Sequence, residues 1–247
     1  VASAVNARAD FSVTASANAA VVTLTAKHKG TIGNEIQVGV ALAQDEVVPT
    51  GVTVTIVQLS GGAGEPDIEG ALAALGDDHY NVLAVPYTDG AALTALTEEL
   101  DVRASATRQL GALAVTASTG TFGELSTLGL SRNSERLMIV GASGSPSAPW
   151  QWAAAVAAIV TRDAAEDPAQ PYTGVALDGL LASASSTRLT DIERDTLLRS
   201  GIATVRVLAG ALQLERLITT YRLNDRGAED ITLLDITGIL TLELFRY

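Results

Sequence analysis

The chain contains two histidines, His28 and His79, as its only imidazole groups for acid-base catalysis or metal binding. A Ser-His-Asp system needs a histidine that one partner orients and that touches a second partner. His79 directly follows Asp77 and Asp78, so it could belong to such a triad or to a polar turn between a helix and a strand. We favour the turn, because the loop Gly141 to Ser145 lacks the G-x-S-x-G spacing that presents a hydrolase serine.

Two glycine-containing loops each follow a predicted strand, where the next helix N-terminus could hold a phosphate group. In the loop Gly61 to Gly64, a G-x-G-x-x-G pattern starting at Gly62 would need glycine where Asp67 stands. No G-x-x-x-x-G-K-[ST] sequence occurs either, so we interpret this loop as a linker between domains. For the loop Gly141 to Ser145 we predict a flexible connection.

The sequence has no grouping typical of a metal site or a reactive thiol. His28 stands between Lys27 and Lys29, whose charges repel cations, and no paired histidines or multi-aspartate calcium loop occur. There is no cysteine, which excludes disulfides and thiolate catalysis. We therefore predict no cofactor, no metal site and no catalytic residue, and expect that the protein is not an enzyme.

The charge balance argues against nucleic acid as a partner. The formal net charge is −12, whereas phosphate binding depends on clustered Lys and Arg. Residues 188–247 carry 8 basic and 9 acidic side chains, and residues 1–187 carry 8 basic and 19 acidic ones. Of the 16 basic residues, 14 are arginine, which suits fixed bidentate contacts with carboxylates. Such contacts could join neighbouring chains or form pairs within one chain, and the sequence leaves both open.

The length and apolar content bound the domain organisation. With 247 residues, 47% of them hydrophobic, the chain can form one large or two modest domains with a buried core. No apolar run approaches the roughly 20 residues needed to cross a bilayer, so we predict no membrane partner. The chain begins with Val1 and stops at Tyr247 inside an uncapped apolar helical pattern, from which we expect an internal fragment.

Residues 1–60 carry the pattern of a small β-rich domain. Three segments alternate in polarity or are rich in β-branched residues, as strands are. They are Val21 to Ala26, Glu35 to Leu42 and Val52 to Leu59. Between the first two, we expect Gly30 and Gly33 to adopt backbone angles closed to other residues.

Residues 61–201 carry the pattern of an α/β domain. Short apolar strands alternate with helical segments, which predicts a parallel or mixed sheet with helices on both faces. The predicted strands are 81–86, 111–116 and 136–140, and the predicted helices are 67–75, 90–108, 122–130 and 149–162. Thr190 to Glu193 is a capping-box sequence for a further helix, which Gly201 is placed to end.

Residues 202–247 predict a hairpin followed by a helix. Two alternating runs, Ile202 to Leu208 and Leu212 to Tyr221, flank Ala209-Gly210 as paired strands flank a turn. The apolar residues that follow at helical spacing are Leu233, Ile236, Leu240 and Leu244.

Several motifs occur in an order that resembles the contractile tail sheath proteins of bacteriophages, in particular the Mu-like branch. The segment Lys27 to Asn34 is similar to a K-x-x-G-x-x-GN motif of that family. Arg216 to Asp230 is similar to its R-x-x-TTY-x-x-N-x-x-G-x-x-D motif, in which the named positions are Arg, Thr, Thr, Tyr, Asn, Gly and Asp. Pro86 to Asp89 and the DPAQP sequence at 167–171 lie between them, so the resemblance covers most of the chain.

The resemblance implies a subtilisin-like α/β core, although a shared fold does not carry catalytic activity. It also implies a structural subunit that stacks as six-fold rings around a tail tube and contracts to drive the tube through the host envelope. The implied partners are other sheath subunits, the tail tube protein, and baseplate and tail terminator proteins. The implied location is the virion tail, assembled in the bacterial host cytoplasm.

Sheath subunits of this family are joined by extended terminal arms. Because an internal fragment lacks these arms, we expect the chain alone to be monomeric or weakly associating. We predict that Arg216, Arg222 and Arg246 contact acidic faces of neighbouring subunits or of the tube.

Three other functions stay open. The sheath of a type VI secretion system or an R-type pyocin would share the same mechanics. An α/β hydrolase or nucleotide-binding enzyme would share the fold class, but the nucleophile, phosphate loop and metal ligands are missing from the sequence patterns. A binding module on the particle surface could use the β-rich domain and coexist with a sheath function.

Overall fold

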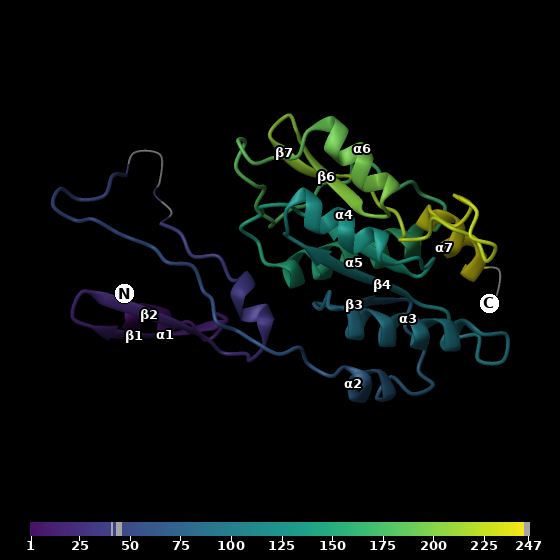
Figure 1. Cartoon of the computed structure of the whole chain (residues 1–247), viewed down its shortest axis with the longest axis horizontal. Coiled ribbons are helices and arrows are strands. Elements are labelled where there is room, and N and C mark those ends of the chain that lie inside the picture. Colours follow the sequence, from purple (N-terminus) through teal and green to yellow (C-terminus); the bar gives the residue numbers. More distant parts are fainter. Residues whose placement is uncertain (41, 43–45, 245–247) are drawn as a thin grey trace. The chain divides into compact units, whose positions relative to one another are not determined.

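The computed structural model describes residues 1–40, 42 and 46–244, which belong to two compact units, Val1–Pro66 and Asp67–Tyr247. The smaller unit contains α1 (Ala2–Asn6), the antiparallel strands β1 (Val13–Asn18) and β2 (Val21–Ala26), and a 3-10 helix, η1 (Thr31–Glu35). The other helices and strands of the described residues belong to the larger unit (Figure 1).

The smaller unit is built around the hairpin of β1 and β2. The strand β2 confirms the first predicted strand, and the turn between the two strands places Ala19 at a φ of 51°. The Asn6 side chain ties α1 to this hairpin. Its amide group donates to the carbonyl of Ala15 and accepts from the N–H of Ala15, both at 2.8 Å.

The glycine-rich loop after β2 is a place of close backbone approach. Gly30 has a φ of 101°, as expected, but Gly33 is not among the positive-φ residues, so that expectation was wrong for Gly33. Glycine is instead favoured at position 33 because there is little room for a side chain: a Cβ there would lie 3.0 Å from the Cβ of Ala26. The Asn34 side chain then bonds the N–H and carbonyl of Gly62 at 2.9 and 3.0 Å.

The strands predicted at Glu35 to Leu42 and Val52 to Leu59 are not formed by their described residues. The Gln58 side chain donates to the carbonyl of Val38 at 2.8 Å and accepts from the N–H of Val38 at 2.9 Å. In a strand ladder, the main chain of a neighbouring strand would make these two hydrogen bonds. Alternating polarity predicts an extended backbone, but it does not supply the neighbouring strand that a ladder requires. Val54 and Val57 consequently stay exposed.

A five-stranded sheet in the order β3-β4-β5-β6-β7 forms the centre of the larger unit. Its strands are β3 (Val82–Ala84), β4 (Leu113–Ser118), β5 (Leu137–Gly141), β6 (Ala203–Leu208) and β7 (Ala211–Arg216). The first four are parallel, and β7 is antiparallel to β6. The three strands predicted for the α/β region are therefore confirmed, and the predicted C-terminal hairpin extends the same sheet.

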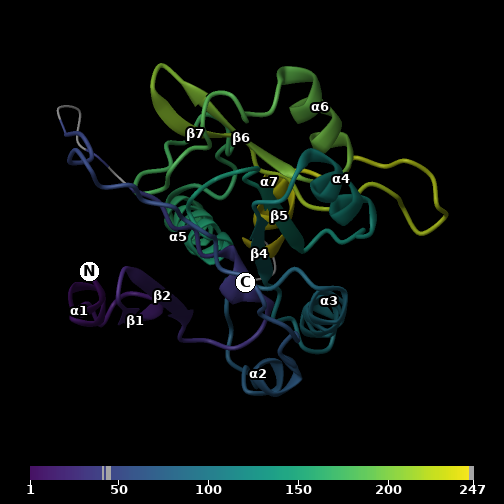
Figure 2. The same cartoon turned by 60° about the vertical axis from the view of Figure 1, so that its left-hand side comes forward.

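The helices of the larger unit cover both faces of this sheet. They are α2 (Glu69–Ala73), α3 (Gly90–Ala104), α4 (Phe122–Leu130), α5 (Pro149–Glu166), α6 (Asp191–Arg199) and α7 (Ile236–Leu244). Figure 2 shows α5 on one side of β4 and β5, and α3 with α4 on the other side. This arrangement confirms the predicted α/β class with a mixed sheet and helices on both faces.

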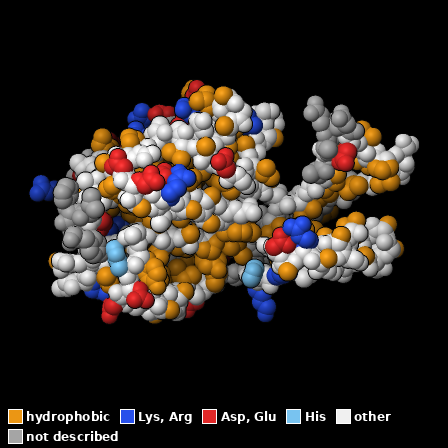
Figure 3. Space-filling model, turned by 180° about the vertical axis from the view of Figure 1, so that it is seen from behind, with side chains coloured by type: hydrophobic (Ala, Val, Ile, Leu, Met, Phe, Trp, Pro, Cys, Tyr) orange, Lys and Arg blue, Asp and Glu red, His pale blue; other side chains and the backbone are white. Residues whose placement is uncertain are grey.

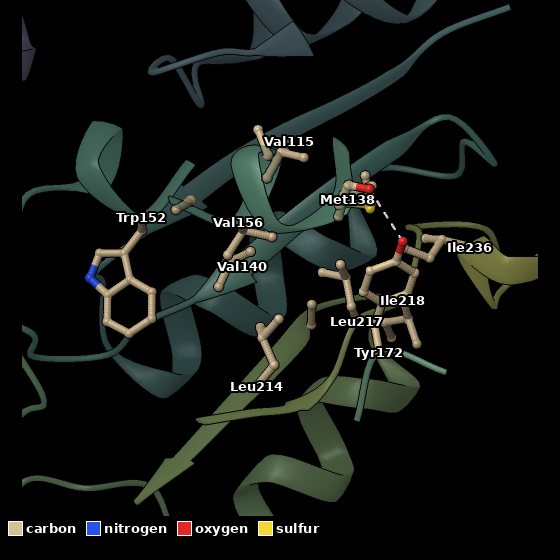
Figure 4. Close-up of a cluster of buried hydrophobic side chains, with 14 of the residues drawn as sticks. Val115, Met138, Val140, Trp152, Val156, Tyr172, Leu214, Leu217, Ile218 and Ile236 are labelled. Atoms are coloured by element: carbon tan, nitrogen blue, oxygen red, sulfur yellow. Dashed lines mark hydrogen bonds between the residues drawn. The ribbon is translucent and has the colours of Figure 1, made fainter. Parts of the chain in front are cut away.

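The core consists of two apolar clusters, one on each face, and successive residues of β5 supply them alternately. Met138 and Val140 belong to the cluster under α5, whereas Leu137 and Ile139 belong to the cluster under α3 and α4. Within the first cluster, Trp152 lies at one end (Figure 4). Burying an aliphatic side chain such as Leu137 or Val140 contributes about 1.5 to 3 kcal/mol, so the two clusters together hold the sheet between the helices.

The helix boundaries follow from capping residues in the sequence. Thr190 and Glu193 form the predicted capping box, in which the Thr190 N–H donates to the Glu193 carboxylate at 2.7 Å. The helix they begin, α6, is followed by Gly201 at a φ of 81°, as predicted for its end. Pro149 occupies the first turn of α5, where N–H groups have no acceptor within the helix, so the absence of an N–H in proline costs no helical hydrogen bond.

Candidate functional site

The segment Arg216 to Asp230, which carries the family motif, leaves β7 and packs against the start of β5. The N–H of Thr220 donates to the carbonyl of Leu137 at 2.9 Å. Its hydroxyl accepts from the N–H of Ser134 at 2.9 Å and donates to the Ser134 carbonyl at 3.1 Å. Thr219 makes two hydrogen bonds to the segment before α7, and both threonines are fully buried. The paired threonines thus lock this segment into the larger unit.

The remainder of the motif builds a hydrogen-bonded loop. The Tyr221 hydroxyl donates to the Asp230 carboxylate at 3.0 Å, and Gly227 has a φ of 74°. The Asn224 side chain accepts from two N–H groups further along the loop. Hydrogen bonds from the N–H and hydroxyl of Thr232 hold the pKa of Asp230 below its usual range. Desolvation and the nearby Asp230 raise the pKa of the Tyr221 hydroxyl.

The three arginines predicted to form an assembly interface differ in their surroundings. Arg216 lies at the end of β7 with 54% of its side chain exposed, and its guanidinium is 3.7 Å from Asp235. The Arg222 guanidinium donates to two main-chain carbonyls near the end of α4, both at 3.1 Å. Arg246 lies outside the described residues. Arg216 is therefore exposed but already beside a carboxylate, while Arg222 fastens the loop to its own unit.

His79, the histidine considered for a catalytic triad, lies beside the main chain just before β4. The Nε2 atom of His79 lies 3.1 Å from the carbonyl oxygen of Gly111, in the connection between α2 and β3. Among the described residues, no three or more His, Asp or Glu side chains are grouped as a metal site would require. In the same part of the chain, no helix has the length and apolar character to span a bilayer.

The loop Gly141 to Ser145, predicted as a flexible connection, packs against the larger unit at most of its residues, although Gly144 is exposed. Ala142 and Ser145 are buried, and the Ser145 hydroxyl accepts from the indole N–H of Trp152 at 3.0 Å. A Cβ on Gly141 would lie 2.7 Å from a side-chain carbon of Ile202. Small residues are typical of flexible loops, but here they allow the chain to pass close to β6, a long-range contact that local sequence does not reveal.

The chain shares its fold with solved structures of sheath tail proteins. It matches the sheath tail protein of Desulfitobacterium hafniense with a TM-score of 0.55 at 17% identity, covering 81% of this chain and 46% of that chain. The match to the sheath tail protein from Listeria innocua has a TM-score of 0.53 at 15% identity, covering 95% and 55%. A chain of the anti-feeding prophage baseplate matches with a TM-score of 0.51 at 22% identity, covering 74% and 49%. At such identities these matches establish the fold alone.

The chain belongs to the phage tail sheath family, because residues 61–220 match the family model described as the phage tail sheath protein central domain. It is 35% identical to the Mu-like prophage FluMu tail sheath protein of Haemophilus influenzae over 239 residues. The alignment covers 96% of this chain and 49% of that relative, so the chain spans about half the length of the relative. The resemblance to the Mu-like branch that the motifs indicated is confirmed.

Proposed function

We propose that the chain is the central part of a structural subunit of a contractile phage tail sheath. In this proposal, subunits polymerise as stacked rings around the tail tube, and the sheath contracts to drive the tube through the host envelope. The observation that carries it is the family match over residues 61–220, together with the 35% identity to a Mu-like prophage tail sheath protein.

The packing of the larger unit supports a role as a rigid body. Two buried apolar clusters cover the two faces of the sheet. Because close-packed protein interiors have low compressibility, such a unit transmits strain with little internal deformation. Contraction would then change the contacts between subunits and leave each unit intact, as in other transitions that move rigid bodies about an interface. The free energy of contraction would come from these contacts, so the chain needs no catalytic group.

The proposed partners are other sheath subunits, the tail tube protein, and the baseplate and tail terminator proteins. We place the assembled protein in the virion tail and its assembly in the host cytoplasm. Arg216, Arg222 and Arg246 stay the proposed contacts to acidic surfaces. On the face drawn in Figure 3, acidic and basic side chains lie next to one another in several small groups, as suits interfaces made of paired charges.

Gold labelling of intact particles tests the proposal directly. Antibodies against the chain should decorate the outer layer of the tail along its whole length in negative-stain micrographs, and label on the capsid or tube would contradict it. The rival interpretation as a hydrolase predicts covalent labelling by a serine-directed fluorophosphonate probe, and we expect none. A type VI or pyocin origin would place the label on particles without a capsid.

A further inference from the structure

A cavity of about 350 Å³ lies beyond the carboxyl end of β5, away from the Arg216 to Asp230 segment. Its wall consists of the loop Gly141 to Ser145, Trp152 of α5, parts of the chain between 182 and 194, and the hairpin of β6 and β7. In open sheets with parallel strands, ligands bind in crevices outside the carboxyl ends of the strands. The position of this cavity is therefore one at which α/β folds hold ligands.

The charges that line the cavity are mainly positive. The lining contains three arginines, Arg188, Arg194 and Arg206, and a single carboxylate, that of Asp191. Arg194 is already neutralised, because its guanidinium lies 2.7 Å from Asp191 and 2.7 Å from Glu215. Neither Arg188 nor Arg206 forms an ion pair with any residue that the structure describes. Two guanidinium groups thus carry uncompensated charge at the cavity wall.

Arg206 also has an unused buried donor. Its Nε atom is inaccessible to solvent and has no hydrogen-bond partner among the described residues. The Arg188 Nε donates to the carbonyl of Ser183 at 3.1 Å, which leaves both of its terminal nitrogens for another acceptor. A buried donor without an acceptor is destabilising, and a carboxylate matches the forked geometry of a guanidinium with two oxygens. The side chains at the wall therefore suit carboxylate oxygens.

We propose that this pocket, lined by Arg188 and Arg206, binds the carboxylate side chains of an acidic segment on a second copy of the chain. The proposal rests on the proposed sheath function, which brings many copies together. The formal net charge of −12 means that acidic side chains outnumber basic ones on every copy, so a second copy can supply carboxylates. Since the pocket and the acidic segment are different surfaces, the contact is heterologous, and heterologous contacts generate rings and helical stacks.

The acidic segment best suited as a probe is the one at 65–69. Glu65, Asp67 and Glu69 alternate along the chain and are exposed. Within the chain, Glu65 accepts a hydrogen bond from the Thr31 hydroxyl and Asp67 accepts one from the N–H of Glu69, and neither forms an ion pair with a described residue. A peptide of residues 63–70, AGEPDIEG, presents the three carboxylates, and the peptide AGQPNIQG is its uncharged counterpart.

Trp152 provides the readout of binding. The chain has two tryptophans, so the Trp150→Phe protein keeps only Trp152, which is 1% exposed in the cavity wall. We expect the acidic peptide to change the Trp152 fluorescence saturably and to bind more weakly as salt is added. The amide peptide should have no effect. Equal binding of the two peptides would overturn the proposal, and so would a response to inorganic phosphate without any response to the acidic peptide.

Substitutions locate the binding to the two arginines. Arg206→Gln and Arg188→Gln should each raise the Kd of the acidic peptide by roughly tenfold or more, because each removes a charge-assisted hydrogen bond. Arg226→Gln is the matched control, since Arg226 is exposed and outside the cavity wall, and its Kd should equal that of the unsubstituted protein. Circular dichroism checks that each variant is folded. Wild-type affinity in either folded pocket variant would contradict the proposal.

Different outcomes would contradict the proposed sheath function and the proposed carboxylate-binding pocket. If gold labels the tail sheath and the acidic peptide does not bind, only the pocket proposal falls. If the peptide binds but the label lies elsewhere on the particle, the sheath assignment falls.

Discussion

At the residue scale, the hydroxyl of Thr220 joins the family motif to the strand it covers. Replacing Thr220 by Val keeps the shape but removes both hydrogen bonds to Ser134. The N–H and carbonyl of Ser134 then lose their partner in a part-buried setting, which costs about 1 to 3 kcal/mol. We expect T220V to lower the free energy of unfolding by that amount, measured by urea denaturation.

The matched control for this change is Thr127→Val on α4. The Thr127 hydroxyl donates to the carbonyl of Gly123 at 2.9 Å, but the residue is exposed, so water can replace the lost bond. The control should change the free energy of unfolding by less than about 0.5 kcal/mol. Equal losses in T220V and T127V would mean that the motif threonine does not lock the segment.

Tyr172 offers a residue-scale prediction about pH. Burial, together with the charges of Asp163 and Asp167, raises the pKa of Tyr172 from 10.0 to about 12. Its hydroxyl donates to the carbonyl of Val160 at 3.3 Å, as the dashed line in Figure 4 marks. A raised pKa stabilises the folded state below pH 10.0, and this stabilisation is lost as the pH rises towards about 12.

Spectrophotometric titration measures this effect through tyrosinate absorbance. The chain has five tyrosines, and we expect one of them to ionise close to pH 12 in the folded protein. Tyr172→Phe should remove that late step and flatten the fall in unfolding free energy between pH 10.0 and 12. A late step that persists in Y172F would assign it to another tyrosine.

At the element scale, the turn between β6 and β7 is built from an unfavourable residue. Ala209 has a φ of 51° and Gly210 a φ of 82°, as in a two-residue hairpin turn that favours Asn-Gly. Alanine in the left-handed region is strained by about 1 kcal/mol. Thermal unfolding should show Ala209→Asn to be more stable by about 0.5 to 1 kcal/mol, and Gly210→Ala to be less stable by at least about 1 kcal/mol. The opposite order would contradict the turn geometry.

The elements also show which sequence signals sufficed for the fold. Apolar runs between helical segments predicted β3, β4 and β5, because strands buried on both faces must be apolar throughout. Local caps predicted the start of α6. The alternating segments at 35–42 and 52–59 failed as strands because ladder formation depends on a neighbour that the pattern does not specify.

The candidate site was predictable only in part, because a local sequence pattern does not specify which distant segments pack together. The order of threonine, tyrosine, asparagine and glycine in the motif indicated the loop after β7, since each residue acts on nearby backbone. The pocket was missed because Arg188 and Arg206 come to line one cavity only when the chain before α6 packs beside β6. The small residues of the Gly141 to Ser145 loop are typical of a connection between elements, so they did not indicate that this loop forms a wall of the pocket.

At the scale of the whole molecule, the chain alone should not form rings. The resemblance to tail sheath proteins implies that extended terminal arms join the subunits, and this chain spans about half the length of its 35% identical relative. Multi-angle light scattering of the purified chain should give the mass of a monomer near 25.4 kDa or a weak, concentration-dependent association. A stable hexamer or tubes would contradict this expectation.

The two units differ in how many buried apolar residues they contain, and this difference leads to a prediction about folding. Both apolar clusters consist of residues from the larger unit, whereas Val13 is the buried hydrophobic residue of the smaller unit among those described. A polypeptide of about 60 residues is marginally stable even with a good core. The polypeptide 67–247 should therefore keep a cooperative thermal transition within a few degrees of that of the whole chain, and the polypeptide 1–66 should lack one. Loss of cooperativity in 67–247 would show that the sheet and its two helical layers depend on the residues before them.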